Sequence, residues 1–428
     1  MSLGLTPVRK PASVSPSYRR LVLFMLTLVY VVNFVDRQVL SVLLEPIRRD
    51  LGLSDTQLGL LSGLAFAAFY VTFGIPFARI ADRYSRRNLV VVCMLAWSAM
   101  TALCGMTVNL AQLLAARIGV AIGEAGCIAP AQSIIADYYS PAERPAALSV
   151  FSVGAPVGVF LGLLLGGWLA ELFGWRMALI LIGLPGMLLA LLVLGTVREP
   201  IRGMSSGIST TERPGRFIDD ARQLLSRRSM PLIAVGAGMQ SMVLYGMGAW
   251  LPSFYQRLHH LQTHEVGSLL AVVNGIGAGL GTLGGGFLAA ALARRDRRWL
   301  CWLPAIAAAT ATPLYAGAVL ASDIFWSIAC VFPAALLGSV VVAPTLAAVH
   351  SVSGVALRAT GLSLVLFLTN LVGIGGGALV VGAVSDALKE LEAVNSLRYG
   401  LLAVLSANFL AIAGYTWAGR YVRTDTQD

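Results

Sequence analysis

Two apolar stretches of the sequence carry ionisable side chains within them. One contains Asn33, Asp36 and Arg37, and the other contains Arg117 and Glu124. A charge at membrane depth costs at least roughly 2–3 kcal/mol, so such side chains usually face an aqueous cavity or an opposite charge. A carboxylate that alternates between wet and dry surroundings can bind and release a proton. We therefore expect these five residues to form a substrate-binding and proton-coupling site, although a static ion pair would use the same residues.

Helical geometry predicts which of these side chains share a face. Successive residues of an α-helix are rotated by about 100°, so Asp36 and Arg37 should point in different directions, whereas Asn33 and Arg37 share a face. Arg117 and Glu124 also share a face, about 10 Å apart along the axis. Asp36 is therefore expected to look across the bundle towards Arg117 or Glu124. The alternative for Arg117 and Glu124 is a charge cluster that only fixes helix packing.

Composition places these residues in a membrane protein. The chain has 428 residues, of which 57% are hydrophobic and 12% charged, and its mean hydropathy is +0.77. Soluble proteins contain about 25% charged residues, whereas apolar runs of roughly 20 residues match a bilayer. The fold class that we predict is an all-α polytopic membrane protein with twelve spanning helices, at approximately 21–43, 57–80, 88–108, 110–135, 146–171, 176–196, 230–255, 265–292, 299–320, 324–349, 358–384 and 397–419.

The net charge of +10 comes from basic residues between the apolar runs. If the N-terminus is inside, most of the lysines and arginines fall in inside segments, which is the positive-inside pattern. This distribution explains the basic pI without a nucleic-acid partner. We expect a multi-pass protein of the bacterial inner membrane with both termini in the cytoplasm. The five cysteines lie in or beside apolar runs without metal spacing, so we expect no metal, cofactor or disulfide.

A polar stretch rich in Arg, Ser, Gly and Pro divides the apolar runs into two groups of six. Across it, Arg144–Ser149 is similar to Arg358–Ser363, each at the start of the fifth run of its group. Paired six-helix halves are typical of transporters whose site lies between the halves. The predicted domains are a cytoplasmic N-terminal segment, a six-helix bundle, a cytoplasmic linker, a second six-helix bundle and a cytoplasmic tail, at 1–20, 21–196, 197–229, 230–419 and 420–428.

The loop after the second apolar run carries a family signature. Ala78–Arg87 contains Asp82, Arg83, Arg86 and Arg87, and it resembles the loop motif of the major facilitator superfamily, with two of the motif's glycines replaced. The resemblance implies a cytoplasmic gate, in which Asp82 meets the positive N-terminal end of the eleventh span and the arginines complete a charge network. The alternative is a basic loop that only sets topology.

The fifth apolar run contains Gly154, Pro156, Gly158 and Gly162. Glycines at i+4 spacing form a groove that another helix backbone can approach closely. The run resembles the superfamily's fifth-helix motif, a packing hinge of the first half. We favour a packing role without substrate contact.

The second half has almost no buried charge. Its polar candidates for the cavity are Tyr245, Asn274, Thr369 and Asn370, set among apolar side chains. A sugar site needs more hydrogen-bonding groups, because an unpaired buried hydroxyl is costly. A charged half that faces an apolar half therefore suits an amphiphilic substrate.

Within the superfamily, the first half resembles the spinster family of lipid carriers. The resemblance rests on Asn33–Arg37, Gly123–Ala125, Ile134–Tyr138 and Leu148–Phe151. It implies export or flipping of lysophospholipids or sphingoid phosphates, with protons as the coupling ion. Arg37 would attract the anionic head group, and Asp36 and Glu124 would exchange a proton or compete for that arginine.

Our leading hypothesis is thus a secondary transporter that works by alternating access, as a monomer among membrane lipids. Within the same class, a carrier of sugar acids, other organic anions or drugs is the alternative. A receptor or channel of the same architecture would not alternate. A membrane-embedded enzyme would need paired acids or a histidine with a nucleophile near one interface, which Asp36 and Glu124 alone do not supply, so we expect no enzymatic activity.

Overall fold

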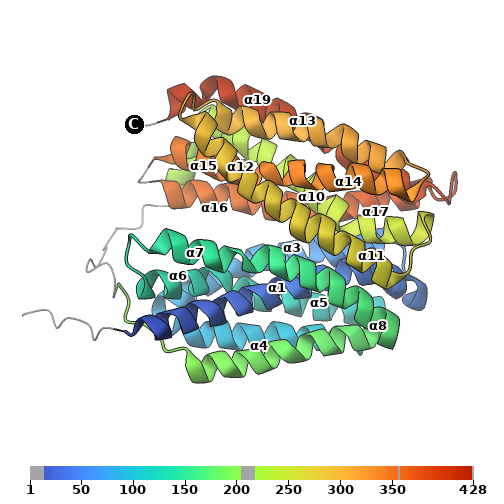
Figure 1. Ribbon diagram of the computed structural model, residues 1–428, viewed down its shortest axis with the longest axis horizontal. Coiled ribbons are helices and arrows are strands. Elements are labelled where there is room, and N and C mark those ends of the chain that lie inside the picture. Colours follow the sequence, from blue (N-terminus) through green and yellow to red (C-terminus); the bar gives the residue numbers. More distant parts are fainter. Residues whose placement is uncertain (1–13, 204–216, 355–356, 427–428) are drawn as a thin grey trace, which may run out of the picture.

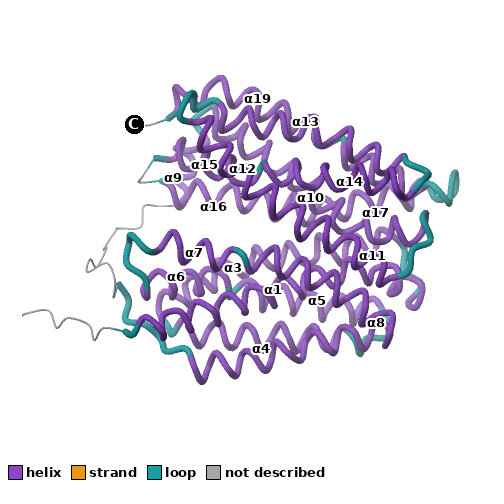
Figure 2. The backbone as a smooth tube through the Cα atoms, in the orientation of Figure 1, coloured by secondary structure: helices purple, strands orange, loops and turns teal. Residues whose placement is uncertain are grey.

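The structure, a computed structural model, describes residues 14–203, 217–354 and 357–426. All regular secondary structure in these residues is helical (Figure 2). The first half contains α1 (Pro16–Leu51), α2 (Asp55–Gly59), η1 (Leu60–Leu64), α3 (Ala65–Arg83), α4 (Arg86–Cys104), α5 (Leu110–Ala125), α6 (Ile128–Tyr138), α7 (Arg144–Ser152) and α8 (Gly154–Thr196).

The second half follows a short helix that lies within the expected linker, α9 (Phe217–Leu225). It contains α10 (Ser229–Leu258), α11 (Thr263–Leu270), η2 (Ala271–Gly277), α12 (Ala278–Ala293), α13 (Trp299–Leu320), α14 (Ile324–Val340), α15 (Val342–Ser353), α16 (Arg358–Leu368), η3 (Thr369–Gly376), α17 (Gly377–Leu388), α18 (Ser396–Leu405) and α19 (Ala407–Asp425). The three η segments are π-helical turns inside longer helices, and such turns are frequent at functional sites.

Local sequence explains where several helices begin and end. Ser15 and Ser85 cap the N-termini of α1 and α4 by accepting backbone hydrogen bonds, and Ser54 forms a capping box at α2. Gly52 ends α1 in the left-handed conformation, which glycine adopts without steric cost. Helix α1 is longer than the expected span 21–43, because charged residues continue the helix beyond both ends of the apolar run.

Twelve membrane crossings result, as expected. Eleven helices in the described residues are long and apolar enough to span a bilayer, and one of them, Arg144–Thr196, has 53 residues. This helix is interrupted at Gly174, where φ is 80° and ψ is 161°. The segments before and after Gly174 both pack on α1. Gly162, before the break, contacts Val35, and Gly186, after the break, contacts Val32. They therefore form the fifth and sixth crossings.

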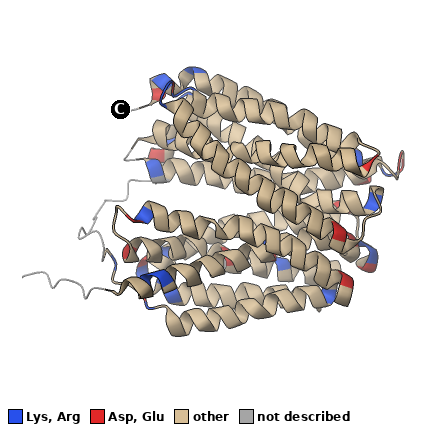
Figure 3. Cartoon of the chain, in the orientation of Figure 1, with Lys and Arg blue, Asp and Glu red and all other residues tan. Residues whose placement is uncertain are grey.

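The helices form two bundles that lie side by side (Figure 1). The described ends of the chain and the start of the linker lie at one end of the molecule, which we call the termini side; the opposite end is the far side. Charged residues concentrate at these two ends (Figure 3). This distribution fits two membrane surfaces separated by an apolar layer.

The two halves contact each other mainly through far-side elements. α1 packs on α10, α2 packs on α17, and α8 packs on α11 and η2. The termini-side elements α6, α7, α12, α15 and α16 have their main contacts within their own half. Figure 1 shows the bundles diverging towards the termini side accordingly. The protein is therefore held together on the far side in this conformation.

Candidate functional site

The centre of the candidate site is an ion pair between α1 and α5. Arg37 Nε lies 2.5 Å from Glu124 Oε2. The Glu124 side chain is fully buried, whereas 14% of the Arg37 side chain is exposed. The two charges thus meet inside the first half, and the arginine is the member of the pair that solvent reaches.

Aromatic rings surround the Arg37 guanidinium. Its central carbon lies 4.6 Å from the ring centre of Tyr70, 5.2 Å from that of Phe66 and 5.5 Å from that of Phe34. Cations are attracted to ring faces at these distances. The α3 rings were not among the sequence candidates, although their spacing of four residues places them on one helical face. The rings therefore surround the guanidinium at the point where it pairs with Glu124.

Asp36 points away from Arg37, as helical geometry predicts. Its side chain is fully buried and faces Trp97 and Thr101 of α4, within electrostatic range of Glu124 and Arg117. Arg117 is 5% exposed and lies 5.2 Å from the Phe66 ring centre. Asn33 is fully buried beside Glu124. The structure therefore brings all five predicted polar residues into one cluster whose formal charges balance.

The second half contributes one predicted residue to this region. Tyr245 of α10 is 40% exposed and lies close enough to Arg37 and Tyr70 to interact with them electrostatically. Asn274 lies in η2, and Thr369 and Asn370 lie in η3. The Thr369 hydroxyl donates to a carbonyl of its own helix at 3.0 Å. Of the four second-half candidates, the structure brings Tyr245 to the charged cluster.

On the far side, an ion-pair network joins the two halves. Arg257 of α10 donates to Glu45 at 2.6 Å and to both carboxylate oxygens of Asp55 at 2.8 and 2.7 Å. The Arg257 side chain is 17% exposed, and those of Glu45 and Asp55 are 1% and 7% exposed. We call these three residues the far-side lock. Buried, multidentate ion pairs of this kind are costly to break once formed.

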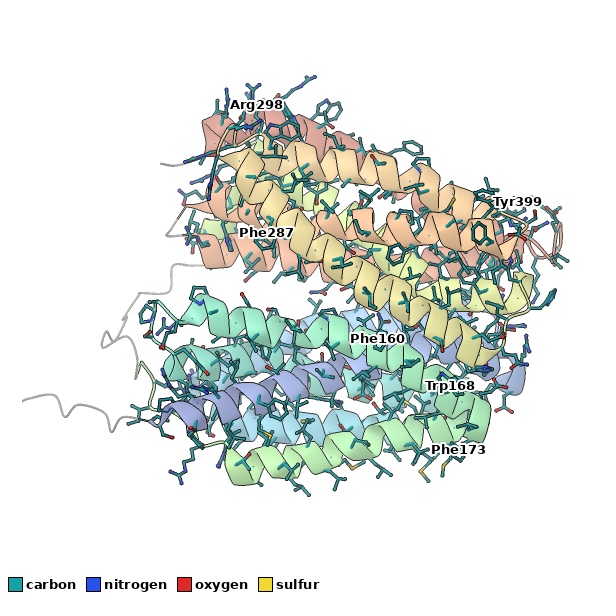
Figure 4. All side chains as sticks on the ribbon, in the orientation of Figure 1. Phe160, Trp168, Phe173, Phe287, Arg298 and Tyr399 are labelled. Atoms are coloured by element: carbon teal, nitrogen blue, oxygen red, sulfur yellow. The ribbon has the colours of Figure 1, made fainter. Side chains whose placement is uncertain are left out.

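Other polar contacts on the far side also cross between the halves. Asp386 of α17 accepts hydrogen bonds from the backbone N–H groups of Asp55 and Thr56, at the N-terminus of α2. Trp168 of α8, which Figure 4 labels, donates to Ser268 of α11 at 3.1 Å. None of these residues was among the sequence candidates. The signal that could have indicated them is that acidic residues lie close in sequence to the few basic residues expected outside.

The residues of the predicted cytoplasmic gate separate into two groups on the termini side. Asp82 and Arg83 are exposed at the end of α3, and the Asp82 carboxylate has no ion pair among the described residues. Arg86 is 5% exposed and pairs with Asp137 at 2.6 Å and with Glu199 at 2.9 Å.

Glu199 connects the gate loop to the start of the linker. It accepts hydrogen bonds from the backbone N–H of Arg87 at 2.7 Å and from Ser85 at 2.9 Å. Burial raises the pKa of Glu199, but these hydrogen bonds and the ion pair with Arg86 outweigh it, so the pKa lies below its ordinary value. The predicted latch between Asp82 and the eleventh span remains a prediction for another conformation.

The glycines of the fifth span pack against α1. A Cβ atom added at Gly158 would lie 2.5 Å from the carbonyl oxygen of Val31, and one at Gly162 would lie 2.9 Å from that of Val35. Gly154 approaches α1 in the same way. Pro156 instead faces α12, since a Cβ at Gly279 would lie 3.4 Å from it. The groove therefore serves packing within the first half, while the hinge role stays a prediction.

Comparisons with known proteins agree with this architecture. The family model of the Major Facilitator Superfamily matches residues 26–378. An MFS-type efflux pump of Mycolicibacterium smegmatis is 34% identical over 406 residues, covering 93% of this chain and 92% of its own. A probable galactarate/D-glucarate transporter, GudP, of Bacillus subtilis is 26% identical over 299 residues, covering 64% and 66%.

A solved structure matches almost the whole chain. It is the crystal structure of a bacterial homolog of the human lysosomal transporter spinster in an inward-facing and unoccupied conformation. The identity is 30%, the TM-score is 0.89, and the match covers 97% of this chain and 100% of that one. The family match and this structural likeness confirm both the fold class and the resemblance that the sequence predicted. This chain belongs to the Major Facilitator Superfamily and is similar to the spinster homologs within it.

Proposed function

We propose that this chain moves anionic amphiphiles of the lysophospholipid or sphingoid-phosphate type by alternating access, with transport coupled to protons. The observation that carries the proposal is the Arg37–Glu124 pair in its aromatic surround. A guanidinium binds phosphate through parallel N–H donors. When a phosphate forms an ion pair with Arg37, Glu124 loses its partner. A buried carboxylate without a partner takes up a proton. Substrate binding and proton uptake would thereby be coupled at one pair of side chains.

The apolar character of the second half supports an acyl chain as the rest of the substrate. α12 exposes Leu280, Leu283 and Phe287, the last of them labelled in Figure 4. α16 exposes Leu366 and Phe367. Hydroxyl-rich substrates would find few partners on these surfaces, whereas burying an alkyl chain contributes about 0.8 kcal/mol per CH₂.

The direction of opening follows from the charge distribution. We propose that the termini side is cytoplasmic, because it carries the basic loops, and that the protein lies in the bacterial inner membrane as a monomer. The far-side lock would then close the periplasmic face in this conformation. The likeness to an inward-facing homolog supports this assignment.

The test uses purified protein in liposomes and a fluorescent lysophospholipid, with and without a pH gradient. Gradient-driven movement is expected for the wild type and is expected to be lost in Arg37→Ala, Glu124→Gln and Asp36→Asn. Arg37→Lys is the matched variant: it keeps the charge but loses the paired donors, so we expect weaker binding with coupling retained. Folded protein that binds another solute but moves no lysolipid would defeat the lipid assignment.

A second candidate is a carrier of sugar acids or other organic anions. Its specific support is the similarity to the probable galactarate/D-glucarate transporter, since a carboxylate can also pair with Arg37. Competition distinguishes the two: inhibition of lysolipid movement by short-chain sugar acids at low concentration would favour the second candidate. Saturation by lysolipid alone favours the first.

A further inference from the structure

A group of arginines lies at the termini-side end of α13 and α19, on the side of the second half that is away from the first half (Figures 1 and 3). Two segments far apart in the sequence supply it, the loop between α12 and α13 and the end of α19. We call this group the arginine corner. Its members are Arg294, Arg295, Arg297, Arg298, Arg420 and Arg423.

The acids of these two segments already have partners. Arg423 binds Asp296 through two contacts, Nε to Oδ1 at 2.9 Å and Nη2 to Oδ2 at 2.7 Å. Asp296 also accepts a hydrogen bond from the backbone N–H of Arg298 at 2.9 Å. Asp425 accepts instead from the backbone N–H and the hydroxyl of Ser229, each at 2.7 Å. These two carboxylates are therefore not free to neutralise the other arginines.

The arginine corner carries positive charge that the described protein groups do not balance. Arg294, Arg295 and Arg420 are exposed and form no ion pair among the described residues. The loop at the same place in the first half, between its second and third crossings, is different, because Arg86 there pairs with two carboxylates. An anion from outside the chain can supply in the second half what acidic side chains supply in the first.

Two tryptophans place the arginine corner at the membrane surface. Trp299 and Trp302 of α13 meet edge to face, with ring centres 5.9 Å apart. A Cβ atom added at Gly419 would clash with the Trp302 indole, so this ring lies directly against the backbone of α19. The guanidinium carbon of Arg298, which Figure 4 labels, lies 5.7 Å from the Trp302 ring centre. Tryptophan is enriched where a membrane protein passes from hydrocarbon to headgroups.

Exposed apolar side chains continue from the arginine corner into the expected bilayer. Ile306 follows Trp302 by four residues on α13, and Trp417 precedes Arg420 by three residues on α19. Each therefore lies one turn deeper on the same helical face. Both side chains are 53% exposed. Along both helices, basic groups at the membrane surface thus give way to an apolar surface that lipid can cover.

We propose that the arginine corner binds the headgroup of an anionic phospholipid from the surrounding leaflet, with the acyl chains against Ile306 and Trp417. Guanidinium groups bind phosphate oxygens through paired N–H donors. Basic pockets of membrane proteins recognise anionic headgroups in this way. Arginines from two segments can contact two phosphates at once, so we expect diphosphatidylglycerol to bind more tightly than phosphatidylglycerol.

Topology alone does not require this arrangement. The positive-inside pattern explains basic residues in each termini-side segment, but not their convergence beside an indole that is packed on a glycine of a distant helix. A phosphate without acyl chains would gain nothing from Ile306 and Trp417. The site also lies outside the space between the halves, so it is separate from the Arg37 region and does not depend on the proposed function.

The first test titrates purified protein in detergent with diphosphatidylglycerol, phosphatidylglycerol or phosphatidylethanolamine and counts bound lipids by native mass spectrometry. A basic residue at a membrane surface strengthens anionic-lipid binding by roughly fivefold. A variant with both Arg294→Gln and Arg420→Gln should therefore bind diphosphatidylglycerol at least roughly tenfold more weakly. The matched control combines Arg79→Gln and Arg83→Gln, which remove the same charge from exposed positions at the termini-side end of α3.

The second test locates the lipid with a diphosphatidylglycerol that carries a photoreactive acyl chain. Crosslinks are expected on the segments of α13 and α19 that contain Ile306 and Trp417, and they should decrease in the Arg294→Gln, Arg420→Gln variant. Crosslinks spread evenly over the lipid-facing helices, or unchanged in that variant, would overturn the proposal. Thermal unfolding in lipid-free detergent shows whether each variant is folded.

The remaining outcomes are equally distinct. Equal weakening in the Arg79→Gln, Arg83→Gln control, or equal affinity for phosphatidylethanolamine, would reduce the effect to general charge and overturn the proposal. Displacement of the lipid by inorganic phosphate at millimolar concentration would assign the arginine corner to free phosphate instead of lipid. None of these measurements involves transport, so failure here leaves the proposed function intact, and failure of that function leaves this site intact.

Discussion

Arg257→Met should release the far-side lock and favour the outward-open state. Arg257 crosses from the second half to Glu45 and Asp55 of the first, at N–O distances of 2.6 to 2.8 Å. Methionine preserves much of the side-chain volume but removes every donor. Because these contacts bridge the halves, their loss destabilises the far-side-closed state and leaves the packing within each bundle unchanged.

The structure sets the size of this effect. Removing one partner of a buried ion pair costs about 3–5 kcal/mol, because the other charge stays buried and unpaired. Glu45 keeps Arg48 and Arg49 as partners, so the loss falls mainly on Asp55. We therefore expect about 2–3 kcal/mol, which shifts the ratio of closed to open states by about 30- to 150-fold.

The assay is double electron–electron resonance between spin labels at the exposed far-side residues Leu172 and Val394, after replacement of the five native cysteines. The distance distribution should gain a longer component in Arg257→Met. Arg176→Met is the matched control, because Arg176 pairs with Asp50 on the same side but within the first half. An unchanged distribution in Arg257→Met, or an equal shift in Arg176→Met, would refute the reasoning.

Three further predictions concern packing, stability and pH. Gly267→Val should also favour the outward-open state in the spin-label assay, because a Cβ there lies 2.5 Å from a backbone oxygen of the first half; Gly248→Val, with nothing within 4 Å, should not. Arg86→Ala should lower the thermal unfolding temperature, at a cost of about 3 kcal/mol for a broken buried pair, whereas the exposed Arg83→Ala should change it little; equal effects would contradict the assigned network. The lowered pKa of Glu199 stabilises the fold above the unfolded value near 4.5, and this contribution is lost as pH falls through the lower folded value. Melting curves of the wild type should therefore show an acid-side loss that is smaller in Glu199→Gln, and identical acid sensitivity of the two proteins would exclude this origin.

Much of the fold could be predicted from the sequence because lipid imposes simple rules on it. Apolar runs of bilayer length must be helices that satisfy their own backbone, and loop charges indicate orientation. Gly174, where the long helix reverses, stands between two such runs. Helical rotation also predicted that Asp36 and Arg37 diverge. Charges at membrane depth had to face the interior, which is why the sequence located the Arg37–Glu124 site.

Contacts between the halves depended on the tertiary structure. Arg257 lies about 200 residues along the chain from Glu45 and Asp55, and nothing local relates them. A transporter must also form and break such contacts during its cycle. Local sequence therefore does not specify one pairing between the halves.

The surroundings of Asp36 show the same division for a different reason. Trp97 and Thr101 are ordinary residues of an apolar helix in the sequence. Their place beside Asp36 comes from the packing of α1 and α4, which buries that carboxylate against them. The sequence by itself determined which residues enter the membrane and that its charges point inward. Which of these charges meet was decided by how the helices pack, because hydrogen bonds depend on distances of tenths of an ångström that no spacing along a chain specifies.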